Sequence, residues 1–206
     1  MKTITTNLIT EGIFSDDGTQ RYLLKKTWDK DKPSLAIIML APSEASGIAL
    51  DSTTLLVLNN ACRLGYGSVS ILNLFSTLND YSLKCAEGMD IENTNIIVAS
   101  AKKADTIVYA PGVGKAANKD FIARQEHILT SLIPMQDKLH CLCNANGHGR
   151  LQHPLSPVLR TWTLSPLKIS ELVKHKPKDI PIPAKKKINV VKSNIKPSLP
   201  KERQGG

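Results

Sequence analysis

The sequence lacks the features that mark membrane and secreted proteins. Its longest apolar run, residues 35–41, has the length of a strand and falls far short of the roughly 20 residues that a membrane-spanning helix needs. The N-terminal segment MKTITTNLITEG holds one Lys and no apolar stretch typical of a signal peptide. Aromatic residues are scarce at 4%, yet 41% hydrophobic residues suffice for one sizeable core. We therefore expect a soluble, cytoplasmic protein with one main domain.

Cysteine and the common cofactor motifs are also scarce or missing. Four cysteines in 206 residues make a poor disulfide framework, so we expect reduced thiols. None stands in a CxxC pair of the structural zinc type, and Cys141 and Cys143 are expected to be small core residues on one face of a strand. No phosphate-binding P-loop, GxGxxG or HExxH motif is present. We therefore predict neither a metal nor a cofactor.

Positive charge is concentrated in the C-terminal segment. The formal net charge is +9, and residues 174–206 contribute +8 of it, with nine Lys and one Arg against two acidic residues. The same segment holds five of the twelve prolines and no aromatic residue, a composition typical of a flexible, solvated chain. Such a tail attracts phosphate backbones regardless of their sequence. Composition alone leaves a purely solubilising tail equally open.

Apolar runs of strand length alternate with segments of helical spacing along residues 1–173. An Asp-Gly turn at Asp17 and Gly18 predicts a β-hairpin within residues 12–28. The alternation that follows favours a parallel sheet covered on both faces. We predict a three-layer α/β/α domain over residues 1–173, with a central four-stranded, mainly parallel sheet, an N-terminal β-hairpin and a flexible basic tail at 174–206. The predicted strands are 35–40, 69–75, 106–110 and 140–143, and the predicted helices are 52–64, 91–104 and 121–133.

Polar loops follow all four predicted strands, and ligands of such sheets bind at the carboxyl ends of the strands. Asp51 follows the first strand; its place favours a helix N-cap, with a water-orienting carboxylate as the alternative. Asn73 interrupts an apolar run, where a buried amide costs about 1–3 kcal/mol unless it is hydrogen-bonded. Its donor and acceptor suit the edge of a base, or else the loop backbone. His148 and His153, with Arg150 between them, favour an anion or polar-ligand site.

The order of several motifs resembles that of a known family. The segments RYLLKKTW, IIMLAPSEASG with the following DSTT, GYGSVSILNLF and GHGRLQHPL are similar to motifs of a bacterial and phage family known as a domain of unknown function. This resemblance spans residues 21–155.

Some of these segments also resemble functional segments of the uracil-DNA glycosylases. LAPSEASG is similar to their water-activating loop, SILNL to the strand whose Asn binds a flipped pyrimidine, VYAPGVGKAA to their Trp-Gly-x-x-Ala segment, and QHPLSPV to their His-Pro-Ser-Pro loop. The resemblance implies that Asn73 recognises the base, that His153 stabilises the departing base, and that a residue among 155, 158 and 159 wedges into the minor groove. It implies a base pocket that also includes Ala41, Pro42, Phe75 and His148. It implies DNA contacts from Ser43, Lys115, Arg150, Ser156, Pro157, Leu159, Arg160, Lys185, Lys186 and Lys187.

The sequence departs from the glycosylase pattern in three places. Ala41 stands where many glycosylases have Asp or Asn, so we expect Asp51 to supply the catalytic carboxylate, with Glu44 as second choice. Pro111 replaces the expected Trp. Three further residues, RLQ at 150–152, precede His153 and are expected to reshape the base pocket.

The resemblance implies a DNA glycosylase that hydrolyses the N-glycosidic bond of a modified or damaged pyrimidine and leaves an abasic site. The occurrence of the family of unknown function in bacteria and phages suggests a role in defence against phages with modified DNA. The expected partner is DNA, with neither a membrane nor an obligate protein partner. Two alternatives stay open: a non-catalytic nucleic-acid-binding protein of the same fold, and a hydrolase of free nucleosides or nucleotides.

Overall fold

The computed structural model describes residues 1–43, 48–79, 90–113 and 118–173. By its internal contacts the chain divides into two units, Met1–Lys176 and Pro177–Gly206. The basic tail predicted at 174–206 lies outside the described residues. Cys85 lies outside them as well. In the described part of the chain, no helix has the length and apolar character needed to cross a membrane.

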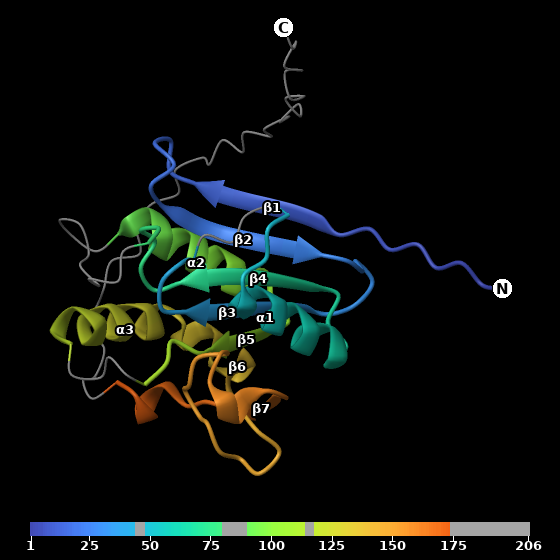
Figure 1. The fold of residues 1–206 in the computed structure, drawn as a ribbon. Coiled ribbons are helices and arrows are strands. Elements are labelled where there is room, and N and C mark those ends of the chain that lie inside the picture. The colour runs from blue at the N-terminus through green and yellow to red at the C-terminus, as the bar shows by residue number, and fades with distance from the viewer. Residues whose placement is uncertain (44–47, 80–89, 114–117, 174–206) are drawn as a thin grey trace, which may run out of the picture. The chain divides into compact units, whose positions relative to one another are not determined.

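Seven strands form a single sheet in the order β1-β2-β4-β3-β5-β6-β7 (Figure 1). The central strands β4, β3, β5 and β6 run parallel, whereas the β1-β2 hairpin and β7 join antiparallel at the two ends. The strands are β1 (Ile9–Phe14), β2 (Arg21–Thr27), β3 (Ser34–Met39), β4 (Ser68–Asn73), β5 (Thr106–Tyr109), β6 (Leu139–Cys143) and β7 (Thr163–Pro166). The helices are α1 (Ser52–Arg63), α2 (Ile91–Lys103) and α3 (Lys119–Ser131), with short 3-10 helices η1 (Ile133–Lys138), η2 (Pro157–Leu159) and η3 (Ile169–Glu171).

Helices cover both faces of the sheet (Figure 1). On one face, Val57 and Ala61 of α1 pack against apolar side chains of β3, β4 and β5, together with the fully buried Trp162. On the other face, α2 and α3 pack over a second apolar cluster that includes Tyr109. These will be called the α1 face and the α2-α3 face. The two clusters follow the inside-outside alternation of strands that are buried on both sides.

The predicted sheet of four strands is too small, since the observed sheet has seven. The hairpin itself is confirmed, but β2 pairs directly with β4 and so becomes part of the sheet. The strand β7 went unpredicted because it has only four residues and ends in Pro166. A proline is tolerated there because β7 is an edge strand, with one side free of ladder hydrogen bonds.

Candidate functional site at the carboxyl edge of the sheet

The chain reverses its direction of travel across the sheet at β3. It passes from β3 through α1 to β4 on one side, and then through α2 to β5 on the other side. In an open α/β sheet, the usual ligand site lies outside the carboxyl ends of two neighbouring strands whose connections leave to opposite sides. Here the rule points to the region between the segments that follow β3 and β5. The segment after β6 also reaches it, because Gly112 donates its N–H to the carbonyl of Leu151 over 3.1 Å.

Asp51 caps helix α1, as its place in the sequence predicted. Its Oδ1 accepts a hydrogen bond of 2.6 Å from the backbone N–H of Thr54. Burial alone would raise the pKa of this carboxyl, but hydrogen bonds from the Ser43 hydroxyl and Thr54, with the charge of Arg21, bring it below the usual value. Asp51 is therefore a carboxylate at every physiological pH. The two roles considered for Asp51, helix cap and functional carboxylate, are compatible. The same carboxylate accepts the Thr54 N–H at the start of α1 and lies at the carboxyl edge of the sheet.

His153, which is partly buried, lies on the loop after β6, with its Cβ and backbone N next to Gly112 of the loop after β5. Burial lowers its pKa, and the negative charge of Asp51 opposes that shift. The backbone N–H of Leu155 donates to Nδ1 over 3.3 Å. Because Nδ1 acts as the acceptor, the proton of the neutral imidazole is on Nε2. His153 is therefore a neutral hydrogen-bond donor at neutral pH.

Asn73 is the last residue of β4 and is only 1% exposed. It alternates with Val69 and Ile71, which pack on the α1 face, so its side chain belongs to the same face as the start of α1. Its backbone carbonyl accepts a hydrogen bond of 3.0 Å from the side chain of Asn93 in α2. Its own amide nitrogen is buried and has no hydrogen-bond partner in the described part of the chain. A buried unsatisfied donor is costly, which makes Asn73 a candidate for ligand recognition.

Arg21 is a residue of this site that the sequence analysis missed. It is 2% exposed, and its Nη1 donates to the carbonyl of Ser43 over 3.0 Å. Burial lowers the pKa of this guanidinium, while the charge of Asp51 raises it. The signal was present in the motif RYLLKKTW, where a charged residue opens a strand that is otherwise partly apolar. Its importance is visible only once β2 is known to pair with β4.

Three residues predicted for the site are held elsewhere. Phe75 is 5% exposed and belongs to the cluster on the α2-α3 face, away from Asp51. Leu159 is fully buried on the α1 face, so the role of surface wedge falls to Leu155 or Val158, which are 47% and 46% exposed. Arg150 forms an ion pair of 3.0 Å with Glu171 and so ties its loop to η3.

The remaining predicted residues lie on the same loops with modest contacts. Ser156 begins η2, and its hydroxyl donates to the side chain of Gln152. His148 lies in a turn closed by a hydrogen bond of 2.8 Å between Asn144 N–H and its own carbonyl. Ala41, Pro42 and Ser43 directly follow β3, and Arg160 is exposed after η2. Glu44, Lys115, Lys185, Lys186 and Lys187 lie outside the described residues.

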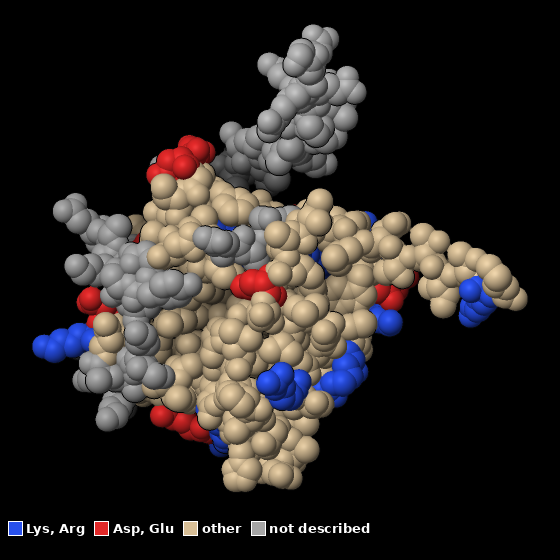
Figure 2. Space-filling model, viewed as in Figure 1, with Lys and Arg blue, Asp and Glu red and all other residues tan. Residues whose placement is uncertain are grey.

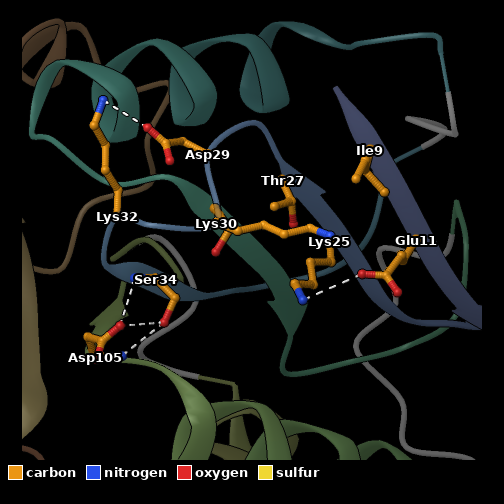
Figure 3. A pocket seen from close by; sticks show the side chains of 10 residues that line it. Ile9, Glu11, Lys25, Thr27, Asp29, Lys30, Lys32, Ser34 and Asp105 are labelled. Atoms are coloured by element: carbon orange, nitrogen blue, oxygen red, sulfur yellow. Dashed lines mark hydrogen bonds and ion pairs between the residues drawn. The ribbon is translucent and has the colours of Figure 1, made fainter. Parts of the chain in front are cut away.

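An open hollow of about 440 Å³ lies at the opposite, amino edge of the sheet (Figure 3). Its charges neutralise one another: Lys25 pairs with Glu11 at 3.5 Å, Lys32 pairs with Asp29 at 3.3 Å, and Asp105 accepts from Ser34. These groups are largely exposed to solvent, where an ion pair contributes about 0–1 kcal/mol. We place the candidate site at the carboxyl edge instead, because charged groups converge there while withdrawn from water.

Charge on the surface is scattered rather than gathered. On the face that Figure 2 shows, Lys and Arg are sparse and interspersed with Asp and Glu. Residues 1–173 carry 17 Lys and Arg against 16 Asp and Glu, a net charge of +1. Nor do the described residues gather three or more His, Cys, Asp or Glu side chains in a group that could hold a metal ion.

The fold and the site define a mixed α/β protein with its polar groups at the carboxyl edge of a parallel sheet. The family model of a protein of unknown function (DUF1643) matches residues 21–155, well over half of the chain. The chain belongs to this family, as its motifs predicted. The match begins at Arg21 and encloses Asp51, Asn73 and His153. No curated protein and no solved structure matches the chain significantly.

Proposed function

We propose that the protein is an N-glycosidase that acts on DNA and removes a modified or damaged pyrimidine, leaving an abasic site. The observation that carries the proposal is the placement of two fixed polar groups at the carboxyl edge: the Asp51 carboxylate, held by the Thr54 N–H, and the His153 imidazole, held by the Leu155 N–H. The order of motifs similar to those of uracil-DNA glycosylases supports the same reaction class. A place in defence against phages with modified DNA belongs to this proposal.

The two groups suit the charges that develop when a glycosidic bond breaks. The bond between C1′ and the base nitrogen lengthens, its electron pair leaves with the base, and the sugar becomes a cation resembling an oxocarbenium ion. Asp51, held as a carboxylate, stabilises that cation. The Nε2–H of His153 donates to the base as it becomes an anion. Water then adds its oxygen to C1′, and its proton passes to the base or to solvent.

Asp51 is suited to electrostatic stabilisation rather than to proton abstraction. Its pKa is lowered, because the Ser43 and Thr54 hydrogen bonds and the Arg21 charge outweigh burial, which makes it a weak base. A highly cationic sugar needs little help from a base, since even neutral water attacks it readily. Ala41, at the position where many glycosylases have Asp or Asn, is therefore compatible with catalysis.

Recognition of the base is assigned to Asn73. An amide donor that is buried without a partner gains most when a ligand supplies an acceptor such as a pyrimidine carbonyl. A base inside a duplex must first leave the stack, at a cost of about a few kcal/mol. Leu155 and Val158 expose apolar side chains beside His153 and could fill the space left by the base.

Hydrolysis of free nucleosides or nucleotides is the second candidate. The near-neutral charge of residues 1–173 favours it, because a DNA enzyme usually presents a basic surface. A non-catalytic DNA-binding protein is the third possibility. In the proposed DNA enzyme, the attraction to DNA rests chiefly on the +8 charge of residues 174–206.

The proposal is tested by incubating the full chain with a panel of DNAs and identifying any released base by mass spectrometry. The panel holds uracil-containing and mismatched duplexes and phage genomes with hydroxymethylated or glucosylated pyrimidines. We expect release from one member of the panel, abolished by His153→Ala and retained by the matched control Lys25→Gln at the amino edge. Release from free nucleosides alone would support the second candidate, and salt-sensitive binding without release would support the third.

A further inference from the structure

An irregularity in β2 turns Arg21 toward the site. In the β1-β2 ladder, Ile13 pairs with Leu23 but the next residue, Phe14, pairs with Arg21. One step along β1 therefore spans two residues of β2, which is the signature of a bulge with one extra residue, Tyr22. The extra residue places Arg21 on the same face as Leu24, which is the α1 face. In a regular strand, residues three apart would lie on opposite faces.

Bulges commonly redirect a side chain at the margin of a functional site. Here the bulge directs a guanidinium to the carboxyl end of β3, where it donates to the Ser43 carbonyl over 3.0 Å. The backbone of Arg21 is fixed as well, because its N–H donates to the carbonyl of Ser76 over 2.8 Å. Arg21 thereby connects the start of β2 to the segments that follow both β3 and β4.

Arg21 also balances the charge of Asp51. The Thr54 amide in α1 donates to this carboxylate, and the groups that interact with it electrostatically are the Arg21 guanidinium from β2, the Ser43 hydroxyl after β3 and the imidazole of His153 after β6. Among them, Arg21 is the one that carries a permanent positive charge. A guanidinium that is only 2% exposed is costly to bury, and an apolar side chain of similar size would often serve stability as well. The free-energy cost of burying it therefore points to a function in the site.

We propose that Arg21 is a positioning residue that fixes the segment 41–43 after β3 and holds the Asp51 carboxylate in place. In that position the negative charge of Asp51 is directed at the reacting sugar. This inference rests on the proposed function, because the sugar cation is the group that the carboxylate stabilises. Arg21 itself touches neither the base nor the water. The bulge at Tyr22 is the structural device that delivers it.

The test compares Arg21→Met with Lys25→Gln in the full chain. Both remove one positive charge from β2, but Lys25 pairs with Glu11 at the amino edge. The first readout is the titration of the Asp51 carboxyl, followed by NMR with carbon-13-labelled aspartate. We expect Arg21→Met to raise the pKa of Asp51 and Lys25→Gln to leave it unchanged. An unchanged titration in a folded Arg21→Met variant overturns the proposal.

The second readout is binding to two duplexes that carry abasic analogues. One has a pyrrolidine, which is cationic at neutral pH and imitates the charged sugar, and the other has a neutral tetrahydrofuran. We expect the wild type to prefer the pyrrolidine and that preference to fall by about tenfold in Arg21→Met, because the carboxylate loses its fixed position. A raised Asp51 pKa in Arg21→Met, with no pyrrolidine preference in the wild type, would sink the proposed function and leave the positioning role intact.

Arg21→Lys keeps the test decisive if Arg21→Met does not fold. Lys retains the charge but lacks the planar, multidentate fork of Arg. We expect the pKa of Asp51 to stay low in this variant, while kcat falls more than KM changes, because the 41–43 segment loses its anchor. Full activity in Arg21→Lys would show that charge alone suffices and would overturn the anchoring part of the proposal.

Discussion

The two edges of the parallel sheet treat charge in opposite ways. At the amino edge, lysines and acids form exposed pairs around an open hollow, as with Lys25 and Glu11. At the carboxyl edge, Arg21 is almost fully buried, Asp51 is tied to a helix N-terminus, and the His153 imidazole is held by a backbone donor. An open hollow therefore lies at one edge and the constrained polar groups at the other.

The presence of a hollow is therefore a weaker guide to function than the free-energy cost of burying the polar and charged groups nearby. Ion pairs that are exposed to solvent contribute little to the stability of the fold. A buried guanidinium and an unsatisfied buried amide are each unfavourable for folding, so their presence at one edge indicates a functional demand there.

The largest effect is expected from removing the charge of Asp51. Asp51→Asn retains a good N-cap for α1 but leaves the buried Arg21 guanidinium without its counter-charge, so the free energy of unfolding should fall by about 1–3 kcal/mol. Loss of the carboxylate should lower single-turnover base release by about 10²- to 10³-fold, since one preorganised electrostatic group is removed. Denaturant unfolding and release kinetics on the same preparation separate the two effects. Equal loss of stability and activity would reduce Asp51 to a structural cap.

A large effect on stability is expected from Asn93→Ala. The fully buried Asn93 donates from Nδ2 to the carbonyls of Asn73 and Leu74, over 3.0 and 3.1 Å. Truncation leaves two buried carbonyls short of a donor and should cost about 1–3 kcal/mol in urea unfolding. Because those carbonyls fix the end of β4, discrimination between bases should weaken as well. A stable variant with unchanged selectivity would break the link between α2 and the site.

A moderate effect is expected from acidification. Burial lowers the pKa of His153 below its ordinary 6.5, although the charge of Asp51 opposes the shift, so the folded state favours the neutral ring. The resulting stabilisation is fully present above pH 6.5 and is lost as pH falls through the lowered pKa of the folded state. Activity should fall over the same window, because protonation removes Nδ1 as the acceptor of the Leu155 N–H. A pH profile of kcat/KM that rises on acidification would contradict a neutral donor.

The smallest effect is expected at the amino edge. Lys32→Gln breaks an exposed pair with Asp29 of 3.3 Å. The free energy of unfolding should change by less than about 0.5 kcal/mol, and base release should stay within twofold of wild type. Thermal unfolding and the release assay check both statements. A loss of activity comparable to that of Asp51→Asn would move the functional site to the hollow.

Much of the fold follows from sequence because its signals are local. The alternating runs placed the parallel strands β3, β4, β5 and β6, and the turn at Asp17 and Gly18 placed the hairpin. The attachment of that hairpin to β4 was missed, since nothing local distinguishes a free hairpin from one paired with a distant strand. The strand β7 was missed for the same reason, with only four residues to signal it.

The candidate site divides along the same line. Asp51, Asn73 and His153 stand out because each is a polar residue near the end of a predicted element. Phe75 was assigned to the base pocket and Leu159 to DNA contact because apolar residues in a motif do not show which way they point, and both are buried in the core. Arg21 was missed because its place in the site depends on a bulge, which no local pattern in RYLLKKTW reveals.

The most direct test of the account is a map of where DNA binds. The nitrogen-15-labelled protein is titrated with a duplex carrying the cationic pyrrolidine analogue, and amide chemical shifts are followed by NMR. We expect the largest chemical-shift changes at the amides of Ser43, Gly112 and Leu155, on the loops after β3, β5 and β6. Changes confined to Thr27, Ser34 and Asp105 around the hollow would contradict the account, because the functional edge would then be the opposite one.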